Sequence, residues 1–453
     1  MSRLDLPTRL ETRNYGVQGF NRNGVVAKAI ACGSSGAGRM VATAMLMGGE
    51  MYWNSVSPDK DRPVPSVRLA SALMAGAFVL TVAPAAAQDL SETRLFPENP
   101  FWEANTDGWP YLYGQINKGF LVHSDGDDTN FYPLVDNNNS STRAGIKYEE
   151  YWWPGTTVFA NVEGEWKPYS TSDVNQLNKD DVEWDTYDLR KFEVRFDVQD
   201  YGRLWLGQGS TASDGTVEKD LSGTSVVGYS SVADSAAGQF FALGGGQGLS
   251  NVRIGDAFAN LDGLSRRMRA RYDTPEFFGG ARLSSSVGYN ALSGDDDVGW
   301  DVAATFERNE PGEALAMSAG LSFVHFGDGN RTGYGGSASI LHKPSGISVT
   351  VAEGLQDRKG SPRDPLFFYG KLGYRPDLTD LGPTALSVDL FWGEDFRTIN
   401  SESISIGLAG VQTIEYKDTS FDIYGTVRHY SFDESSVDYE NGLSFLTGVR
   451  WSF

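Results

Sequence analysis

The sequence predicts an all-β fold, a transmembrane antiparallel β-barrel of about 16 strands with a long third loop folded into its lumen. Three observations support this. After Gln88, apolar and polar residues alternate with period two through many short segments, as in strands with one apolar face. Short turns alternate with long acidic loops, and a secretory leader precedes the first strand. A soluble multi-sheet protein would bury its apolar faces between sheets, but it would not need a secretory leader, a mature chain without cysteine and this loop asymmetry together.

The composition narrows the class of protein further. The 453 residues carry a formal charge of -21, which argues against binding to nucleic acid, because a phosphate backbone needs a basic surface. Cys32 is the only cysteine, so no disulfide forms within the chain and no cysteine cluster binds zinc. The four histidines are scattered and show no metal-binding spacing.

The leader lies inside the chain. The apolar run 69–87 follows Arg62 and Arg68 and ends in three alanines, which predicts a secretory signal peptide over 62–87, cleaved between Ala87 and Gln88. A membrane anchor is the alternative, since the run is close to spanning length, but its small-residue end favours cleavage.

About 60 residues lie upstream of this leader, where a signal peptide would normally begin the protein. Residues 1–61 show no convincing periodicity, and Met51 offers a later start. We therefore interpret 1–61 as an upstream extension outside the expressed protein or as an extended leader, and 88–453 as the barrel. Peptide mapping that finds residues 1–50 in the expressed protein would contradict a start at Met51.

The strands are clearest in "KFEVRFDV" (191–198), where Phe192 and Val194 lie on one face and Lys191 and Glu193 on the other. In a bilayer the apolar face contacts lipid or a partner subunit, and the polar face lines the lumen. Lys118 is an exception on an apolar face, for which a bulge or an inter-subunit contact remains open. The predicted strands are 111–122, 141–149, 156–168, 187–198, 203–210, 266–274, 281–290, 299–307, 314–325, 333–342, 346–353, 366–375, 384–393, 402–416, 420–431 and 443–453.

A barrel of this size is too wide for its wall side chains to fill, so another part of the chain must narrow the lumen. The longest connection, 210–265, is the candidate. Its acids are predicted to face a basic wall, and such a charged constriction selects permeants by charge and size. The alternative is that the wall cations only solvate a polar lumen. The predicted loop acids are Asp214, Glu218, Asp220, Asp256 and Asp262, and the predicted wall cations are Arg143, Lys147, Lys191, Arg195, Arg203, Arg267, Arg269 and Arg271.

The segments "YGQINKGFLVHSDGDD" (113–128), "DNNNSSTRAGIKYE" (136–149) and "LGQGSTASDG" (206–215), together with the terminal Phe, resemble the general diffusion porins of Gram-negative bacteria, especially the alphaproteobacterial type. The resemblance implies a sixteen-stranded homotrimer whose third loop forms the constriction. It also implies passive diffusion of small hydrophilic solutes and ions, without enzymatic activity. The third loop lacks the family's PEFGG-like stretch, while "PEFFGG" (275–280) falls in a short turn.

Two other functions have weaker support. A substrate-specific channel needs a dedicated lumen pocket or an aromatic ladder, and Phe367, Tyr369 and Phe391 are predicted to face inward. A barrel enzyme such as a lipase or protease needs a nucleophile beside a histidine, and the sequence offers no such set. We predict no cofactor, although the acidic loops 125–130 and 294–299 could hold calcium. Solvated acidic loops are the alternative, because the ligand spacing of an EF-hand is missing.

The chain ends in "GLSFLTGVRWSF", in which Trp451 and Phe453 share the apolar face of the last strand. In a closed barrel this strand pairs with the first, so the terminal aromatic residue lies in an interfacial girdle. The resemblance implies that this end is the recognition signal of the barrel-assembly machinery. The other expected partners are outer-membrane lipid and lipopolysaccharide.

Overall fold

The computed structural model describes residues 42–47, 50–55, 110–292, 295–417, 419–435 and 437–453. Two compact units are distinguished, 1–92 and 93–453. In the first, β1 (Ala42–Met47) and β2 (Glu50–Ser55) form an antiparallel hairpin that the sequence pattern did not suggest. The predicted signal peptide and its Ala87–Gln88 cleavage site lie outside the described residues. No helix in the described part is long and apolar enough to cross a membrane.

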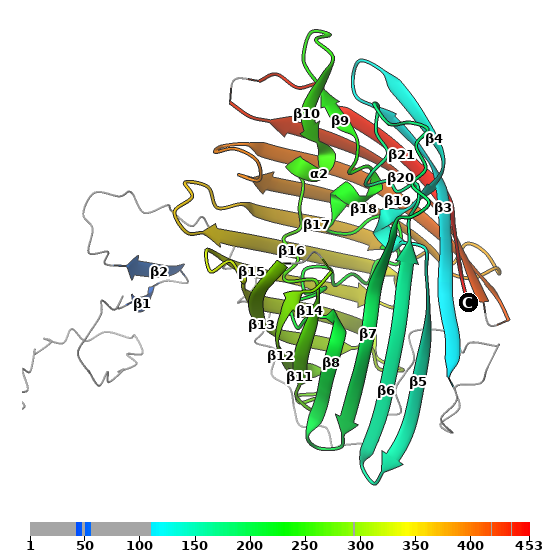
Figure 1. Ribbon diagram of the computed structural model, residues 1–453, viewed down its shortest axis with the longest axis vertical. Coiled ribbons are helices and arrows are strands. Elements are labelled where there is room, and N and C mark those ends of the chain that lie inside the picture. The colour runs from blue at the N-terminus through cyan, green and yellow to red at the C-terminus, as the bar shows by residue number, and fades with distance from the viewer. Residues whose placement is uncertain (1–41, 48–49, 56–109, 293–294, 418, 436) are drawn as a thin grey trace, which may run out of the picture. The chain divides into compact units, whose positions relative to one another are not determined.

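The second unit is a closed antiparallel barrel (Figure 1), which confirms the predicted fold class. Each of its sixteen full strands corresponds to a predicted one. They are β3 (Tyr111–Ser124), β5 (Arg143–Trp153), β6 (Thr156–Trp166), β7 (Tyr187–Val198), β8 (Gly202–Ser210), β11 (Arg266–Asp273), β12 (Ala281–Asn290), β13 (Asp295–Arg308), β14 (Leu315–His325), β15 (Arg331–His342), β16 (Ile347–Arg358), β17 (Leu366–Tyr374), β18 (Thr384–Glu394), β19 (Glu402–Tyr416), β20 (Thr419–Asp433) and β21 (Gly442–Ser452).

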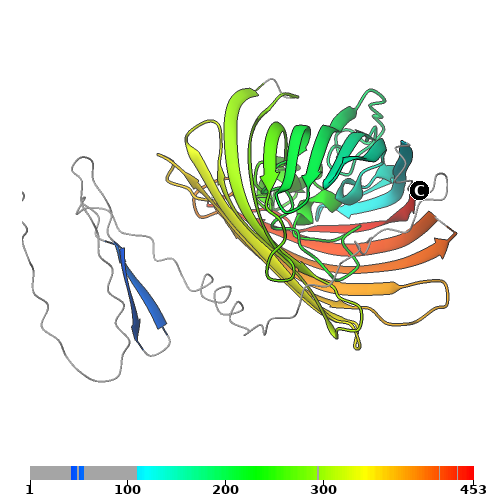
Figure 2. The ribbon, with the colours of Figure 1, turned by 90° about the horizontal axis from the view of Figure 1, so that it is seen from below.

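The ring closes between the last strand and the first. Residues Leu443–Ser452 of β21 pair with Gln115–Ser124 of β3, and in Figure 2 the red C-terminal strand accordingly lies beside the cyan first strand. At the other junction β8 pairs with β11, across the long connection between them. Every strand of the ring therefore has two neighbours, which is the arrangement that satisfies backbone groups in a bilayer.

The two faces of the wall differ as the alternation predicts. Leu372 and Leu408 are 57% and 59% exposed, whereas Ser337 and Ser405 are fully buried. The polar, buried residues thus form the inner face, and the exposed apolar residues form the outer face. The inner face of β14–β19 is rich in serine, glycine and alanine.

One further strand, β4 (Thr129–Asp136), was predicted as loop. It pairs with the second half of β3, while β5 pairs with the first half. The β3–β4 register shifts just after Lys118, the outward-facing cation that the alternation could not explain. Its ammonium lies 2.7 Å from the buried Asp136 carboxylate. A bulge and an ion pair within the chain therefore account for Lys118.

Candidate functional site

The connection between β8 and β11 contains short elements of its own. They are the 3-10 turn η3 (Val232–Ser235), the paired strands β9 (Phe240–Ala242) and β10 (Leu249–Arg253), and the helical turn α2 (Ile254–Ala257) (Figure 1). We call residues 211–265 the constriction segment. Buried apolar side chains such as Val232, Phe241 and Phe258 give it a packed core instead of leaving it an open loop.

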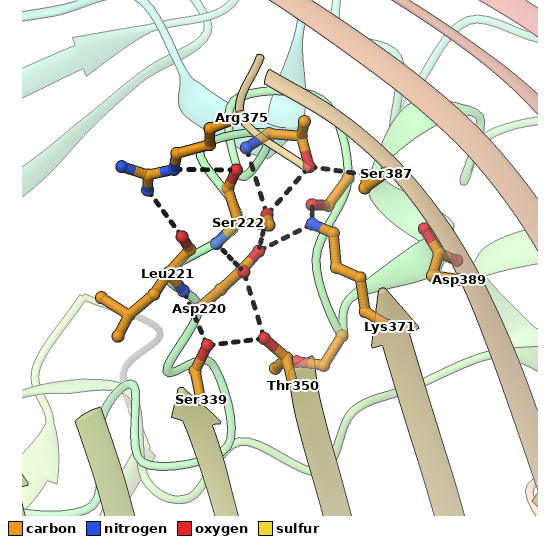
Figure 3. Close-up of polar contacts among 12 residues, drawn as sticks. Asp220, Leu221, Ser222, Ser339, Thr350, Lys371, Arg375, Ser387 and Asp389 are labelled. Carbon is orange, nitrogen blue, oxygen red and sulfur yellow. Dashed lines mark hydrogen bonds and ion pairs between the residues drawn. The ribbon is translucent and has the colours of Figure 1, made fainter. Parts of the chain in front are cut away.

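Inner-face hydroxyl groups and carboxylates bind the backbone of the first half of this segment. The amide of Ser213 donates to Asp301 at 2.9 Å. The amides of Lys219 and Leu221 donate to Ser337 and Ser339, each at 2.9 Å, and Figure 3 shows the Ser339 contact. The wall serines therefore satisfy backbone donors that would otherwise be buried without a partner.

Glycines in the wall permit this close approach. A β-carbon at Gly335 would lie 2.7 Å from Val217, and one at Gly320 would lie 2.8 Å from the carbonyl oxygen of Thr216. Both distances are below ordinary van der Waals contact. The serine and glycine content of β14 and β15 is thus explained by the segment that packs on them.

Aromatic residues fasten the second half of the segment. Phe258 packs against Phe391 and Tyr430 with ring centroids 5.5 and 5.3 Å apart, and Phe367 stacks on Phe391 at 5.6 Å. Phe367, Tyr369 and Phe391 do face inward, as predicted, but they are at most 2% exposed beneath the segment. They therefore serve as a packing surface, and they do not form a ladder open to solutes.

A cavity of about 520 Å³ lies between the constriction segment and the wall of β5–β7, β11 and β21. Opposite charges line it. It brings together four predicted residues, Arg143 of the wall with Asp214, Glu218 and Asp262 of the segment. Its other charged residues are Glu165, Lys167, Arg190, Asp234, Arg266 and Arg450, which the sequence analysis did not single out.

The cations on the wall side differ in how far neighbouring carboxylates neutralise them. Arg190 binds both Glu163 and Glu165, and Arg450 binds Asp422 at 2.9 Å. Arg143 forms no ion pair within the described residues, and its polar contact is Gln115 at 3.5 Å. Arg266, which also lines the cavity, likewise forms no ion pair within the described residues, so the charges of these two arginines are less compensated than those of Arg190 and Arg450.

The acids on the segment side lie close to one another. Both oxygens of Asp262 accept from the amide of Gly215 at 3.0 Å, and Asn260 donates to Glu218 at 2.8 Å. Burial and the nearby charge of Asp214 raise the pKa of Glu218 to about 7. Burial and the neighbouring Glu218 also raise the pKa of Asp262 well above its ordinary value. The negative charge of this side therefore depends on pH near neutrality.

The remaining predicted cations lie on the inner wall outside this cavity. Lys147 sits 4.0 Å from the ring centre of Tyr113, and Lys191 lies 3.9 Å from Glu163. Arg195 and Arg203 both pair with Asp197. Three more follow along β11: Arg267 lines a separate small cavity, Arg269 pairs with Glu193, and Arg271 pairs with Asp273 at 2.7 Å.

Two predicted loop acids also lie elsewhere. Asp220 is buried and pairs with Lys371 of β17 at 2.7 Å (Figure 3). Asp256 is exposed and accepts from the backbone amide of Arg253 at the start of α2. The cavity acids therefore come from the two ends of the segment, around residues 214–218 and 262, with Asp234 between them.

The cavity residues that the sequence analysis omitted differ in how clearly strand parity could have indicated them. Arg450 lies on the polar parity of the last strand and could have been included. Arg190 has the parity of the apolar face, but the β6–β7 register shifts beside it, so both Arg190 and Lys191 face inward. Lys167 falls inside the predicted strand 156–168 on the polar parity of Glu163 and Glu165, so it too could have been included, although β6 ends at Trp166.

One comparison with a solved structure, the first given below, supports the fold. No family model and no curated protein matches the sequence. Among solved structures, the anion-selective porin from Comamonas acidovorans is 15% identical, with a TM-score of 0.53 over 77% of this chain and 100% of that one. OmpT of Vibrio cholerae is 12% identical, with a TM-score of 0.49 over 78% and 99%. Salmonella typhi OmpF is 13% identical, with a TM-score of 0.47 over 77% and 98%.

Proposed function

We propose that this protein is a water-filled outer-membrane channel for passive diffusion of small hydrophilic solutes and ions. The observation that carries the proposal is the cavity lined by opposite charges between the constriction segment and the wall of a closed barrel. Charged side chains on two sides of a watery passage select permeants by charge and size without a dedicated binding pocket. The constriction segment narrows the lumen because it packs on the inner face.

The surroundings follow from the same proposal. The apolar outer face contacts outer-membrane lipid and lipopolysaccharide, or neighbouring copies in a homotrimer. The signal peptide exports the chain through the periplasm, where the assembly machinery receives it. The trimer, the leader and the alphaproteobacterial type rest on the sequence and its resemblance to general diffusion porins. Within the described residues, no group of three acids, histidines or cysteines is arranged to hold a metal ion, and calcium in the acidic loops remains a prediction.

A substrate-specific channel is the second candidate, and single-channel recording in planar bilayers separates the two. A general channel gives conductance in three equal steps, weak ion selectivity and no saturation with sugar-sized solutes. Block by low concentrations of one solute would indicate a specific channel instead. Folded protein that inserts without conducting would contradict both.

The channel is expected to become more cation-selective as the pH rises through about 7. Glu218, whose pKa is raised to about 7, is neutral below that pH and ionised above it. Its ionisation adds negative charge beside Asp214 and Asp262, on the side of the cavity opposite Arg143. Reversal potentials in a salt gradient, measured across this range, report the change.

The matched control is Glu218→Gln, which keeps the bond from Asn260 but removes the titration. This variant should show a much smaller pH step than the wild type. An equal step in both proteins would assign the titration to another group.

A further inference from the structure

Lys371 lies on the inner face of β17, outside the cavity. It binds the constriction segment at two points, Asp220 and Gly228, on either side of residues 221–227, which we call the excursion. Its ammonium donates to Asp220 at 2.7 Å and to the carbonyl of Gly228, also at 2.7 Å. The Lys371 side chain is fully buried and that of Asp220 is 3% exposed. Figure 3 shows this ammonium beside the carboxylate of Asp220.

We propose that Lys371 is the positioning residue of the constriction. Its two hydrogen bonds determine the positions of the Glu218 and Tyr229 side chains in the lining of the cavity. This inference rests on the proposed channel function. Glu218 lies two residues before Asp220, and Tyr229 follows Gly228 directly; both line the cavity. Tyr229 also binds Asp234, a third lining residue. One buried cation therefore fixes the two chain positions next to these groups.

Other wall contacts hold the middle of the excursion. Arg375 donates to the carbonyl oxygens of Leu221 at 2.6 Å and Ser222 at 3.2 Å. Thr224 and Ser387 share a hydrogen bond of 2.7 Å (Figure 3). These contacts keep the excursion on the wall when Lys371 is lost. The amide of Gly228 donates to the carbonyl oxygen of Thr224 at 3.0 Å, but among the wall side chains it is Lys371 that makes a described hydrogen bond to Gly228 itself. The position of Tyr229 therefore depends on Lys371 more than that of residues 221–224 does.

Burying the charges of Lys371 and Asp220 costs free energy, and this cost needs an explanation. A buried ion pair adds little net stability compared with apolar residues of similar volume, because both charges lose their hydration. Thr350 of β16, which is paired with Lys371, and Ser387 of β18, two residues from the paired position, hold the segment with neutral groups. Asp389, the residue of β18 paired with Lys371, binds Arg428 of the wall instead. An ammonium differs from them in having three donors and a long stem, so it can join two separate points of a chain.

The test removes the pair without leaving a buried charge. In Lys371→Met/Asp220→Leu, the segment loses both bonds, but apolar groups fill the space. We expect this double variant to show several conductance levels where the wild type shows one. We also expect its reversal potential at neutral pH to lie closer to zero than that of the wild type. Lys371→Arg, which keeps charge and donors, should restore the wild-type reversal potential.

The matched control is Arg428→Met/Asp389→Leu. This pair is equally buried, at 0% exposure for both side chains with 2.7 Å between the charged atoms, and it also packs near Gly228. Its described hydrogen bonds go to wall residues only. The control should conduct like the wild type. Equal changes in both double variants would overturn the positioning role, because general loosening of the wall would then explain them.

A second measurement does not depend on conduction. Spin labels at Ser225→Cys and Asn139→Cys, in a Cys32→Ser background, both line the cavity: Ser225 belongs to the constriction segment and Asn139 to the 3-10 turn η2 (Asn138–Ser140) between β4 and β5. The label distance should broaden in Lys371→Met/Asp220→Leu and stay narrow in the control. Broadening in a barrel that does not conduct would support the positioning role while contradicting the channel. Conduction with unchanged reversal potential and unchanged label distance would overturn the positioning role alone.

Discussion

Replacing Arg269 with methionine is expected to lower the free energy of unfolding of the barrel by about 3–5 kcal/mol, because it leaves a buried carboxylate without its partner. The side chains of Arg269 and Glu193 are 1% and 4% exposed and form an ion pair. Arg269 also donates to the carbonyl oxygens of Ser210 at 2.8 Å and Gly207 at 2.9 Å. It thus joins β7, β8 and β11 where the constriction segment leaves the wall. Chemical unfolding in detergent micelles, followed by tryptophan fluorescence, measures the loss.

Two further variants show whether the buried charge is the cause. Glu193→Leu/Arg269→Met removes both charges and should recover most of the stability. Arg308→Met breaks a more exposed pair with Glu313, in which the side chains are 31% and 36% exposed, and it should cost about 0–1 kcal/mol. If Arg269→Met unfolds like Arg308→Met, the Arg269–Glu193 pair contributes no more than a surface ion pair does.

The prediction for Arg269 differs from the role that the sequence suggested. Strand parity correctly places Arg267, Arg269 and Arg271 on the inner face, but parity does not show which arginine meets a carboxylate from another strand. Glu193 lies 76 positions away in the chain. Whether an inward arginine faces a permeant or holds the wall together is therefore decided by pairings across strands.

The fold was accessible from the sequence because each strand carries its own signal. One face must be apolar toward lipid and the other polar, so the alternation is enforced residue by residue. The strand β4 escaped because only its edge to β3 is paired within the ring, and its sequence "TNFYPLVD" contains Pro133 and a positive φ at Leu134. A proline and a left-handed residue are typical of loops.

Only part of the candidate site could be predicted from the sequence. Its charged wall residues lie on strands or at their ends, where faces follow from alternation, but most of its acids lie on an irregular connection that alternation does not describe. Asp214, Glu218 and Asp262 could be proposed from their place in a long acidic connection. Their separation from Asp220 could not, since it depends on Lys371 of β17, more than a hundred residues away. No periodicity describes the path of an irregular segment, whose position is set by packing against the wall.

The C-terminal residue closes the barrel at its seam. The amide of Phe453 donates to the carbonyl of Gly114 at 3.0 Å, and the amide of Gly114 donates back at 2.9 Å. The Phe453 ring lies 5.1 Å from that of Trp451, which in turn stacks on Phe421 at 6.1 Å. A β-carbon at Gly114 would lie 2.8 Å from the carbonyl oxygen of Arg143 and 2.9 Å from the Phe453 ring, so a glycine at this position of the first strand leaves room for both. The terminus is thus paired and packed where chain ends are normally frayed.

Deleting Phe453 is therefore expected to reduce strongly the amount of folded protein in the outer membrane, while the channels that do assemble keep wild-type conductance. The deletion removes two seam hydrogen bonds and an aromatic contact at the end of β21 but no side chain that lines the cavity. It also removes the end that the resemblance assigns to recognition by the assembly machinery. Heat-modifiable mobility of membrane fractions measures the folded amount, and planar bilayers measure the conductance. Phe445→Ala is the matched control, since it removes an outer-face phenylalanine from the middle of the same strand, 44% exposed. An equal loss in the control would point to lost lipid contact, and altered conductance with normal assembly would assign Phe453 a role in the pore.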